Sequence, residues 1–496
     1  MPRPFIVPVL LTLLTAACAA HDWNSPQTAV PPPTGWSGRL WAGPAQGAPP
    51  APQAEHCHRA PQAFDLAGPM PPASGQHSGR PGKRGHAERA SRSEGALMAK
   101  PRRAEASADG ADAPAPAPPA ATAPSTAADA LARPTSPVDR PWRQRPDNSP
   151  VTAGVVDDNA DFGAYLGFRG RHPGLTVRDR DVSERYRLTV HDPAGRPVPD
   201  ADVRLFSAGR EQPLWARTDA GGQVWLHPRA AGLAGDVFEV QVSKPGAAGE
   251  GALQGRALLR RGQRDQLQIT LDGAQALAPT RLDLVFLVDA TGSMADEIGK
   301  LRDSMRAMAD QIARLPSRPS ICYGLVAYRD RGDDFFVRGL DFTDDLGAFQ
   351  QGLAAVQAGG GGDTPEALNE ALHTAVHRLS WRGGDATRLV LLVADAPPHL
   401  DYGAPWYDDD MQAALARGIK LLTIGASGLD RGGEYVFRHL AQYTGGRFVF
   451  LTYADAHRPG SGPGRETLHD VGNYSVQTLD RLVVRLVREE LARRPG

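Results

Sequence analysis

The sequence predicts an α/β protein with a doubly wound, mostly parallel sheet, preceded by a small all-β sandwich and a long disordered N-terminal region. Three observations lead to this prediction. Residues 282–289 (LDLVFLVD) and 388–394 (RLVLLVA) are continuous apolar runs, as in strands buried on both faces of a parallel sheet. Between residues 184 and 272, apolar and polar residues alternate in short runs separated by Gly and Pro turns. Before residue 151, prolines are concentrated and apolar residues are few.

The first 18 residues have the pattern of an export signal. Arg3 is followed by an apolar stretch over residues 5–14, which is too short to span a bilayer. Residues 15–18 (TAAC) then resemble a bacterial lipobox, which implies a lipid on Cys18. Because Ala19 follows the cysteine, this resemblance implies sorting to an outer membrane. A soluble periplasmic or secreted protein is the alternative, and in either case we expect an exported protein.

Residues 19–150 consist largely of Ala, Pro, Gly, Ser and Arg. Such a segment cannot bury enough apolar surface to offset its ordering entropy, so we predict a disordered tether. The chain has three cysteines. If Cys18 carries a lipid, Cys57 lies in the tether and Cys322 in a predicted strand, so we expect no disulfide framework.

Apolar and aromatic residues return after the tether. We interpret residues 151–183 as a linker or docking segment and residues 184–275 as the β-sandwich. Residues 192–206 (DPAGRPVPDADVRLF) and 218–226 (TDAGGQVWL) are similar to transthyretin-like or carboxypeptidase-regulatory-like modules. This resemblance implies a spacer or a minor binding surface.

Residues 281–455 alternate between strand and helix patterns, which predicts the doubly wound sheet. A stripe of apolar residues follows residue 294 at helical spacing and predicts a helix that packs on the sheet. Further strands are expected at residues 321–328, 335–342 (an antiparallel edge), 419–426 and 448–452, and further helices at 365–380 and 435–443. Residues 456–496 are predicted to form a loop and a final amphipathic helix.

Oxygen-bearing side chains follow these predicted strands. Asp289, Thr291 and Ser293 lie on the loop that leaves the first strand, Thr364 follows a run of glycines, and Asp395 ends another buried strand. Loops at the carboxyl ends of parallel strands converge on one crevice, where open α/β sheets bind ligands. Carboxylates and hydroxyls are ligands for Mg²⁺, and Mn²⁺ or Ca²⁺ accept the same set. We expect Mg²⁺ at this position, with Mn²⁺ and Ca²⁺ as alternatives.

The order of these five residues resembles the metal-ion-dependent adhesion site of von Willebrand factor type A domains, whose pattern is Asp-x-Ser-x-Ser, a later Thr and a later Asp. Thr291 stands where the family usually has Ser, and Ala396 follows Asp395 where Gly is common. The resemblance covers residues 281–453. It implies a divalent cation that binds an acidic group of a protein or glycan partner, and no enzymatic activity.

Other interpretations of the same residues remain open. Ser293 and Thr364 could instead be helix N-caps. A Mg²⁺-dependent phosphohydrolase of the haloacid-dehalogenase type also has an Asp at the end of a strand, but it needs a general acid two residues later, where this chain has Thr291. A scaffold with a purely structural metal is a third possibility. The net charge of -1 gives no support to nucleic acid as a partner.

Overall fold

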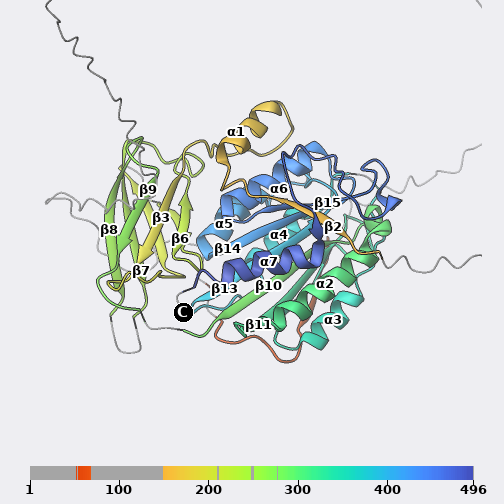
Figure 1. The fold of residues 1–496 in the computed structure, drawn as a ribbon, viewed down its shortest axis with the longest axis horizontal. Coiled ribbons are helices and arrows are strands. Elements are labelled where there is room, and N and C mark those ends of the chain that lie inside the picture. The colour runs from red at the N-terminus through yellow and green to blue at the C-terminus, as the bar shows by residue number, and fades with distance from the viewer. Residues whose placement is uncertain are drawn as a thin grey trace, which may run out of the picture. The chain divides into compact units, whose positions relative to one another are not determined.

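The computed structural model describes residues 52, 54–68, 149–208, 212–246, 251–275, 278–362 and 364–494. Within these ranges the chain forms one nine-stranded mixed sheet, flanked by helices, and two smaller antiparallel-rich sheets (Figure 1). The predicted fold class is confirmed. The predicted signal segment and Cys18 lie outside the described residues. No helix in the described part of the chain is long and apolar enough to cross a membrane.

An inner strand of the large sheet is β10 (Arg281–Asp289), which pairs in parallel with β11 (Ser320–Tyr328) and β13 (Ala386–Ala394). Beyond β13 the sheet continues in parallel through β14 (Ile419–Gly425) and β15 (Phe448–Thr452). Every residue of β13 is buried, as expected for a strand covered on both faces. The carboxyl ends of β10 and β13 therefore lie side by side.

Helices cover both faces of this sheet. One face packs against α2 (Ile298–Ala313), α3 (Leu346–Ala354) and α7 (Leu479–Leu491), and Figure 1 shows α7 beside α2. The other face packs against α4 (Leu368–His377), α5 (Tyr407–Arg417) and α6 (Arg431–Thr444). On α2 the buried side chains recur every three or four residues, which is the stripe that the sequence predicts; they include Leu301, Met305, Met308 and Ile312.

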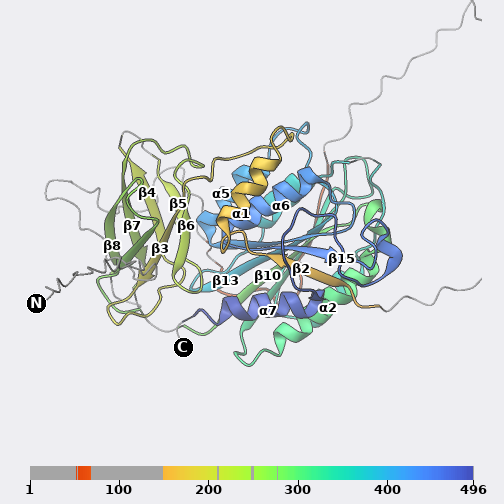
Figure 2. The same cartoon turned by 45° about the horizontal axis from the view of Figure 1, so that its top comes forward.

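The sandwich consists of a three-stranded and a four-stranded sheet, and its strands are labelled in Figure 1 or Figure 2. The first contains β3 (Tyr186–His191), β6 (Gln223–Leu226) and β9 (Gln266–Thr270). The second contains β4 (Asp202–Ser207), β5 (Leu214–Arg217), β7 (Val237–Lys244) and β8 (Leu253–Arg260). Side chains of both sheets form the core between them, including Leu188, Val203, Val240 and Leu267.

Part of the predicted tether is folded, so the prediction of disorder throughout residues 19–150 is wrong. β1 (Ala63–Leu66) pairs antiparallel with β12 (Val337–Thr343) and makes β12 an inner strand rather than the predicted edge. Phe64 lies over Gly339, where any side chain would collide with its ring. The average composition of a long segment conceals a short strand whose hydrogen-bond partners come from a distant edge. Apart from residues 52, 54–68, 149 and 150, the predicted tether lies outside the described residues.

The expectation of no disulfide is also wrong. Cys57 and Cys322 form a disulfide with Cα atoms 5.9 Å apart, across a sequence separation of 265 residues. Cys322 lies on β11, and backbone hydrogen bonds such as His58 N to Phe342 O (2.9 Å) place Cys57 beside it. A pairing over this distance in sequence has no local signal, because it depends on the route of the chain along the sheet edge.

The segment 151–183 is more than a linker. β2 (Thr152–Val156) lies between β15 and β16 (Gln477–Thr478) and pairs antiparallel with both. It is followed by α1 (Phe162–Arg171), whose Tyr165 hydroxyl is 3.0 Å from His439 Nδ1 of α6. The α/β domain therefore takes strands from before the sandwich, and its boundaries extend beyond the predicted 281–455 on both sides.

Candidate metal centre

The loop that leaves β10 is held by side-chain hydrogen bonds. Asp289 ends the strand, and its Oδ1 accepts hydrogen bonds from the Thr291 backbone N (2.9 Å) and Oγ1 (2.7 Å). The Thr291 and Ser293 hydroxyl oxygens are 3.0 Å apart. Asp289 Oδ2 accepts from the Tyr328 hydroxyl at 3.1 Å. Asp289 and Thr291 are fully buried whereas Ser293 is exposed, so the loop opens to solvent at Ser293.

Asp395 approaches the same loop from the end of the neighbouring strand β13. Asp395 is 6% exposed; burial raises the pKa of its carboxyl group, and the nearby Ser293 hydroxyl acts in the opposite direction. Asp395 Oδ1 is buried without a hydrogen-bond partner. The structure thus brings together four of the five predicted ligands, namely Asp289, Thr291, Ser293 and Asp395.

Thr364 is the fifth predicted ligand. It is exposed and lies in the loop before α4. Among the described residues, no hydrogen bond joins Thr364 to any of the other four predicted ligands. It is not an N-cap either, because α4 begins at Leu368 with Ala367 at the capping position. The capping position of the short 3₁₀ helix over 292–296 is Thr291. The N-cap interpretation of Ser293 and Thr364 is therefore wrong.

Glu366 is a site residue that the sequence reasoning missed. Its backbone pairs with the loop after Asp395, through Glu366 N to Pro397 O (3.0 Å) and His399 N to Glu366 O (3.1 Å). Glu366 is 2% exposed, and its Oε2 is buried without a partner. A Cβ atom placed on Gly361 would lie 2.9 Å from Glu366 Oε1 and 3.1 Å from Thr291 Cβ, so both side chains border one small space. The sequence did contain one signal for Glu366, namely an acidic residue two positions after the predicted ligand Thr364.

Without a cation, the charged forms of these carboxyl groups are disfavoured by burial and by mutual repulsion. Burial, and next the nearby Asp395, raise the pKa of Asp289 to about 7. Burial, followed by repulsion from Asp289 and other aspartates, raises the pKa of Glu366 to about 9, and burial also raises that of Asp395. A bound divalent cation would favour the charged forms and offset this repulsion. The ligands are hard oxygens and two buried carboxyl oxygens have no partner, so the residues fit Mg²⁺, Mn²⁺ or Ca²⁺.

A cavity of about 600 Å³ borders this centre. Gly428 lines it, and a Cβ atom on Gly428 would lie 3.9 Å from Asp395 Cβ. Tyr453, His457 and Leu468 form other parts of its wall, and Leu468 is 53% exposed. The cavity therefore offers space for a partner next to Asp395.

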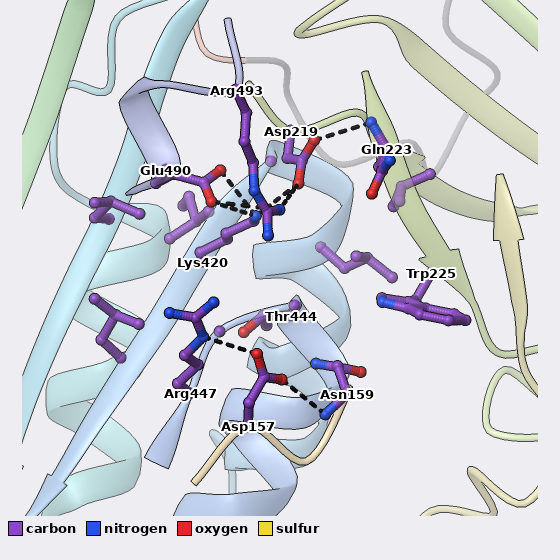
Figure 3. A pocket seen from close by; sticks show the side chains of 18 of the residues that line it. Asp157, Asn159, Asp219, Gln223, Trp225, Lys420, Thr444, Arg447, Glu490 and Arg493 are labelled. Carbon is purple, nitrogen blue, oxygen red and sulfur yellow. Dashed lines mark hydrogen bonds and ion pairs between the residues drawn. The ribbon is translucent and has the colours of Figure 1, made fainter. Parts of the chain in front are cut away.

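A second cavity, of about 220 Å³, lies between the sandwich and the sheet (Figure 3). Its charged side chains, apart from Arg187, pair with groups of opposite charge. Lys420 is 2.7 Å from Asp219 and 2.8 Å from Glu490, and Arg447 pairs in the same way with Asp157 and Glu489. Because these charges are already paired, this cavity gives a weaker indication of a ligand than the centre at Asp289.

Comparison with known proteins agrees with the fold of this part of the chain. Residues 283–398 match the von Willebrand factor A domain model, and this range contains all five predicted ligands. The chain contains a von Willebrand factor A domain. The A domain is also the part that carries the three converging loops, while β1, β2 and α7 add to it from outside the matched range.

Known proteins match this chain over limited regions. It is 27% identical over 166 residues to the alpha-protein kinase vwkA of Dictyostelium discoideum, covering 32% of this chain and 25% of that protein. It is 36% identical over 93 residues to von Willebrand factor A domain-containing protein 7 of Rattus norvegicus, covering 19% of this chain and 10% of that protein. The chain thus spans a quarter or less of the length of these relatives.

Two solved structures are also similar, each at 12% sequence identity. A von Willebrand factor type A protein from Catenulispora acidiphila superposes with a TM-score of 0.28, covering 54% of this chain and 48% of that one. The open conformation of the pilus adhesin SpaC from Lactobacillus rhamnosus GG superposes with a TM-score of 0.29, covering 52% and 32%.

Proposed function

We propose that this protein is an exported binding protein whose A domain captures an acidic group of a partner through a divalent cation held by Asp289, Thr291, Ser293 and Asp395. One observation carries the proposal. Asp395 Oδ1 is buried without a partner beside a hydrogen-bonded loop of acceptor oxygens. A buried carboxylate oxygen left unsatisfied is costly, and a cation would satisfy it. The five residues' order in the sequence and the family match support the same assignment.

The charges of the four proposed ligands would leave a bound cation able to accept a further ligand. Two aspartates only balance a divalent charge, so the cation would keep affinity for a further carboxylate. Ser293 is exposed, and a partner could therefore reach the ion from this side. Thr364 is proposed to contribute its hydroxyl when the ion is bound, and Glu366 adds a third carboxyl group at the edge of the site.

The partner is proposed to be a protein with an acidic side chain, and a glycan carboxylate is the alternative. The cavity beside Asp395, with the exposed Leu468 in its wall, could accept apolar groups that flank such an acidic residue. The N-terminal pattern ending at Cys18 supports export and attachment to a membrane by a lipid. In this proposal, the segment between Cys18 and the folded residues 54–68 connects the domain to that anchor.

Binding is favoured over catalysis by the position two residues after Asp289. A phosphotransferase of the alternative type needs an acid there, whereas Thr291 is a fully buried hydroxyl. Hydrolysis of small phosphoesters in the presence of Mg²⁺, lost in Asp289→Asn, would favour the enzyme. Absence of turnover, together with metal-dependent binding, would favour the proposal.

Two measurements on the full chain test the proposal. Mn²⁺ binding, followed by electron paramagnetic resonance, should be strong in the wild type and lost in Asp289→Ala. The matched control is Asp303→Ala, which removes the same charge from an exposed position on α2. Capture of proteins from an envelope extract should occur with Mg²⁺ and stop with a chelator. Capture that is equal with and without chelator, and equal in Asp289→Ala, would contradict the metal-bridge mechanism.

A further inference from the structure

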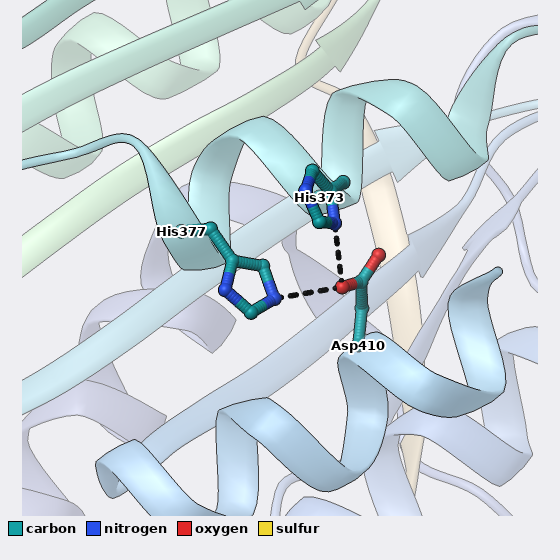
Figure 4. A group of neighbouring side chains, drawn as sticks. All are labelled: His373, His377 and Asp410. Atoms are coloured by element: carbon teal, nitrogen blue, oxygen red, sulfur yellow. Dashed lines mark hydrogen bonds and ion pairs between the residues drawn. The ribbon is translucent and has the colours of Figure 1, made fainter. Parts of the chain in front are cut away.

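We infer that His373, His377 and Asp410 form a second metal site, selective for a late first-row transition metal such as Zn²⁺. The two histidines are four residues apart on α4, so they lie on one face of that helix. Asp410 lies in the first turn of α5, opposite them. Figure 4 shows both imidazoles directed at one carboxylate oxygen.

The distances leave room for an ion after small side-chain movements. Asp410 Oδ1 is 2.9 Å from His373 Nδ1 and 2.9 Å from His377 Nε2. All three ligand atoms lie within 4.8 Å of one another. Ligands of a tetrahedral Zn²⁺ lie about 3.4 Å apart, given bond lengths of about 2.1 Å. The imidazole-carboxylate contacts need to open by about half an ångström, which the half-exposed His373 and the 32% exposed side chain of His377 permit.

A second observation points to a ligand rather than to a simple hydrogen-bonded cluster. Asp410 is 3% exposed, and its Oδ2 is buried without a partner. Its neighbours in α5 are satisfied in another way: Arg178 and Arg180 pair with Asp408, and Arg180 also pairs with Asp409. Asp410 alone of these three faces two imidazoles. Imidazole nitrogens favour Zn²⁺, Ni²⁺ or Cu²⁺ over Mg²⁺ and Ca²⁺, so this site and the oxygen centre at Asp289 select different ions.

The site joins the two helices that follow the loops of the oxygen centre. α4 begins after the loop of Glu366, and α5 follows the loop of Asp395. Asn369 already links them, since its Nδ2 donates to His399 O (2.5 Å) and its Oδ1 accepts from Tyr407 N (2.9 Å). A metal bound by both helices would add a second link between these loops. Three protein ligands leave a further coordination position for water or for a partner.

The test uses the full chain, stripped of metal and held in excess Mg²⁺ so that oxygen sites are occupied. Zn²⁺ binding is measured by calorimetry, and Co²⁺ binding by its visible absorption, which reports tetrahedral nitrogen and oxygen ligands. We expect the variant with both His373→Ala and His377→Ala to lose more than about 100-fold in Zn²⁺ affinity, because even the loss of an outer-shell partner costs 10–100-fold. Asp410→Asn should lose affinity in the same direction.

The matched control is His457→Ala, which removes another exposed imidazole and should leave Zn²⁺ binding unchanged. Asp289→Ala should also leave it unchanged, so failure of this site and failure of the proposed function are distinguishable. Both histidines are on the surface, and circular dichroism verifies that the variants are folded. Identical Zn²⁺ titrations for the wild type and the double variant would overturn the inference.

Discussion

The two ends of the A-domain sheet treat buried carboxylates in opposite ways. At the amino end of β13, Asp200 of the sandwich accepts hydrogen bonds from Arg388 (2.8 Å) and Arg217 (3.1 Å). Burial tends to raise the pKa of Asp200, but these two arginines lower it below its usual range. At the carboxyl end, the fully buried Asp289 has a raised pKa because of burial and a second carboxylate, Asp395.

The difference separates charges that the chain neutralises itself from charges that it leaves to a ligand. At the amino end, Arg382 pairs with Asp283 at 2.6 Å, and Lys420 pairs with Asp219 and Glu490. Arg382 and Lys420 thereby neutralise carboxylates near the amino ends of the strands, and the Lys420–Asp219 pair also joins the A domain to the sandwich. At the carboxyl end, the charge interactions that raise the pKa of Glu366 all come from aspartates. Burial alone therefore does not identify a metal centre, and the missing cationic partner is the informative observation.

The largest expected effect is at the paired end. Asp200→Ala leaves Arg388 and Arg217 buried without this carboxylate, so we expect a loss of about 3–5 kcal/mol in the free energy of unfolding. Urea titration followed by fluorescence and circular dichroism measures it. Asp236→Ala, at an exposed position of the sandwich, should change stability by less than about 0.5 kcal/mol. Equal effects of the two substitutions would remove the distinction between paired and exposed carboxylates.

At the carboxyl end, the expected effect depends on the ion. A cation that binds only the folded chain should stabilise it by about 2.7 kcal/mol at 100 times its dissociation constant. Asp395→Asn should abolish this gain while leaving metal-free stability close to that of the wild type. Urea unfolding in Mg²⁺ and in chelator, at equal ionic strength, measures both quantities. A full Mg²⁺ response in Asp395→Asn would show that the ion binds elsewhere.

Acid should weaken the paired end specifically. The pKa of Asp200 is lowered in the folded state, so its contribution to stability is complete above the unfolded value near 3.9 and is lost as the pH falls below it. The stability difference between the wild type and Asp200→Asn should therefore shrink from pH 6 to pH 3, by about 1.4 kcal/mol for each pH unit below the unfolded value, and the rest is lost only as the pH falls through the lowered folded pKa. Parallel urea titrations at both pH values measure this. A difference that stays constant over this range would contradict the pairing.

The buried strands, and the candidate ligands directly after them, could be predicted from the sequence because both signals are local. The apolar runs before Asp289 and Asp395 define β10 and β13 to within two residues. The position of a ligand at the end of each run follows from the topology of parallel sheets.

The remaining features depend on contacts between distant segments. Glu366 reaches the centre because its backbone N donates to Pro397 O, and Cys57 meets Cys322 because β1 and the residues before it follow the edge of β12. The pair of Asp200 and Arg388 crosses from the sandwich to the A domain, 188 residues away. None of these contacts has a period or a spacing that a single sequence could reveal.

The smallest expected effect compares two buried glutamates. Glu366 has an unpartnered oxygen and a raised pKa, whereas Glu434 of α6 binds His469 and Arg438, and these partners outweigh burial and lower its pKa. With its pKa raised to about 9, Glu366 is mainly neutral at pH 7 without metal, and Glu366→Gln keeps both its shape and its lack of charge, so metal-free stability should change by less than about 1 kcal/mol. Glu434→Gln should cost about 2–3 kcal/mol, because it weakens charge-assisted hydrogen bonds in a buried site.

Chemical denaturation of both variants in chelator gives this comparison, and Mn²⁺ titration of Glu366→Gln then separates two roles. Reduced Mn²⁺ affinity at unchanged stability would place Glu366 among the groups that hold the ion. Unchanged Mn²⁺ affinity would mean that Glu366 lies near the ion without contributing to its binding. If Glu366→Gln instead destabilised the protein as much as Glu434→Gln, Glu366 would have a cationic or donor partner, and the two ends of the sheet would follow the same rule.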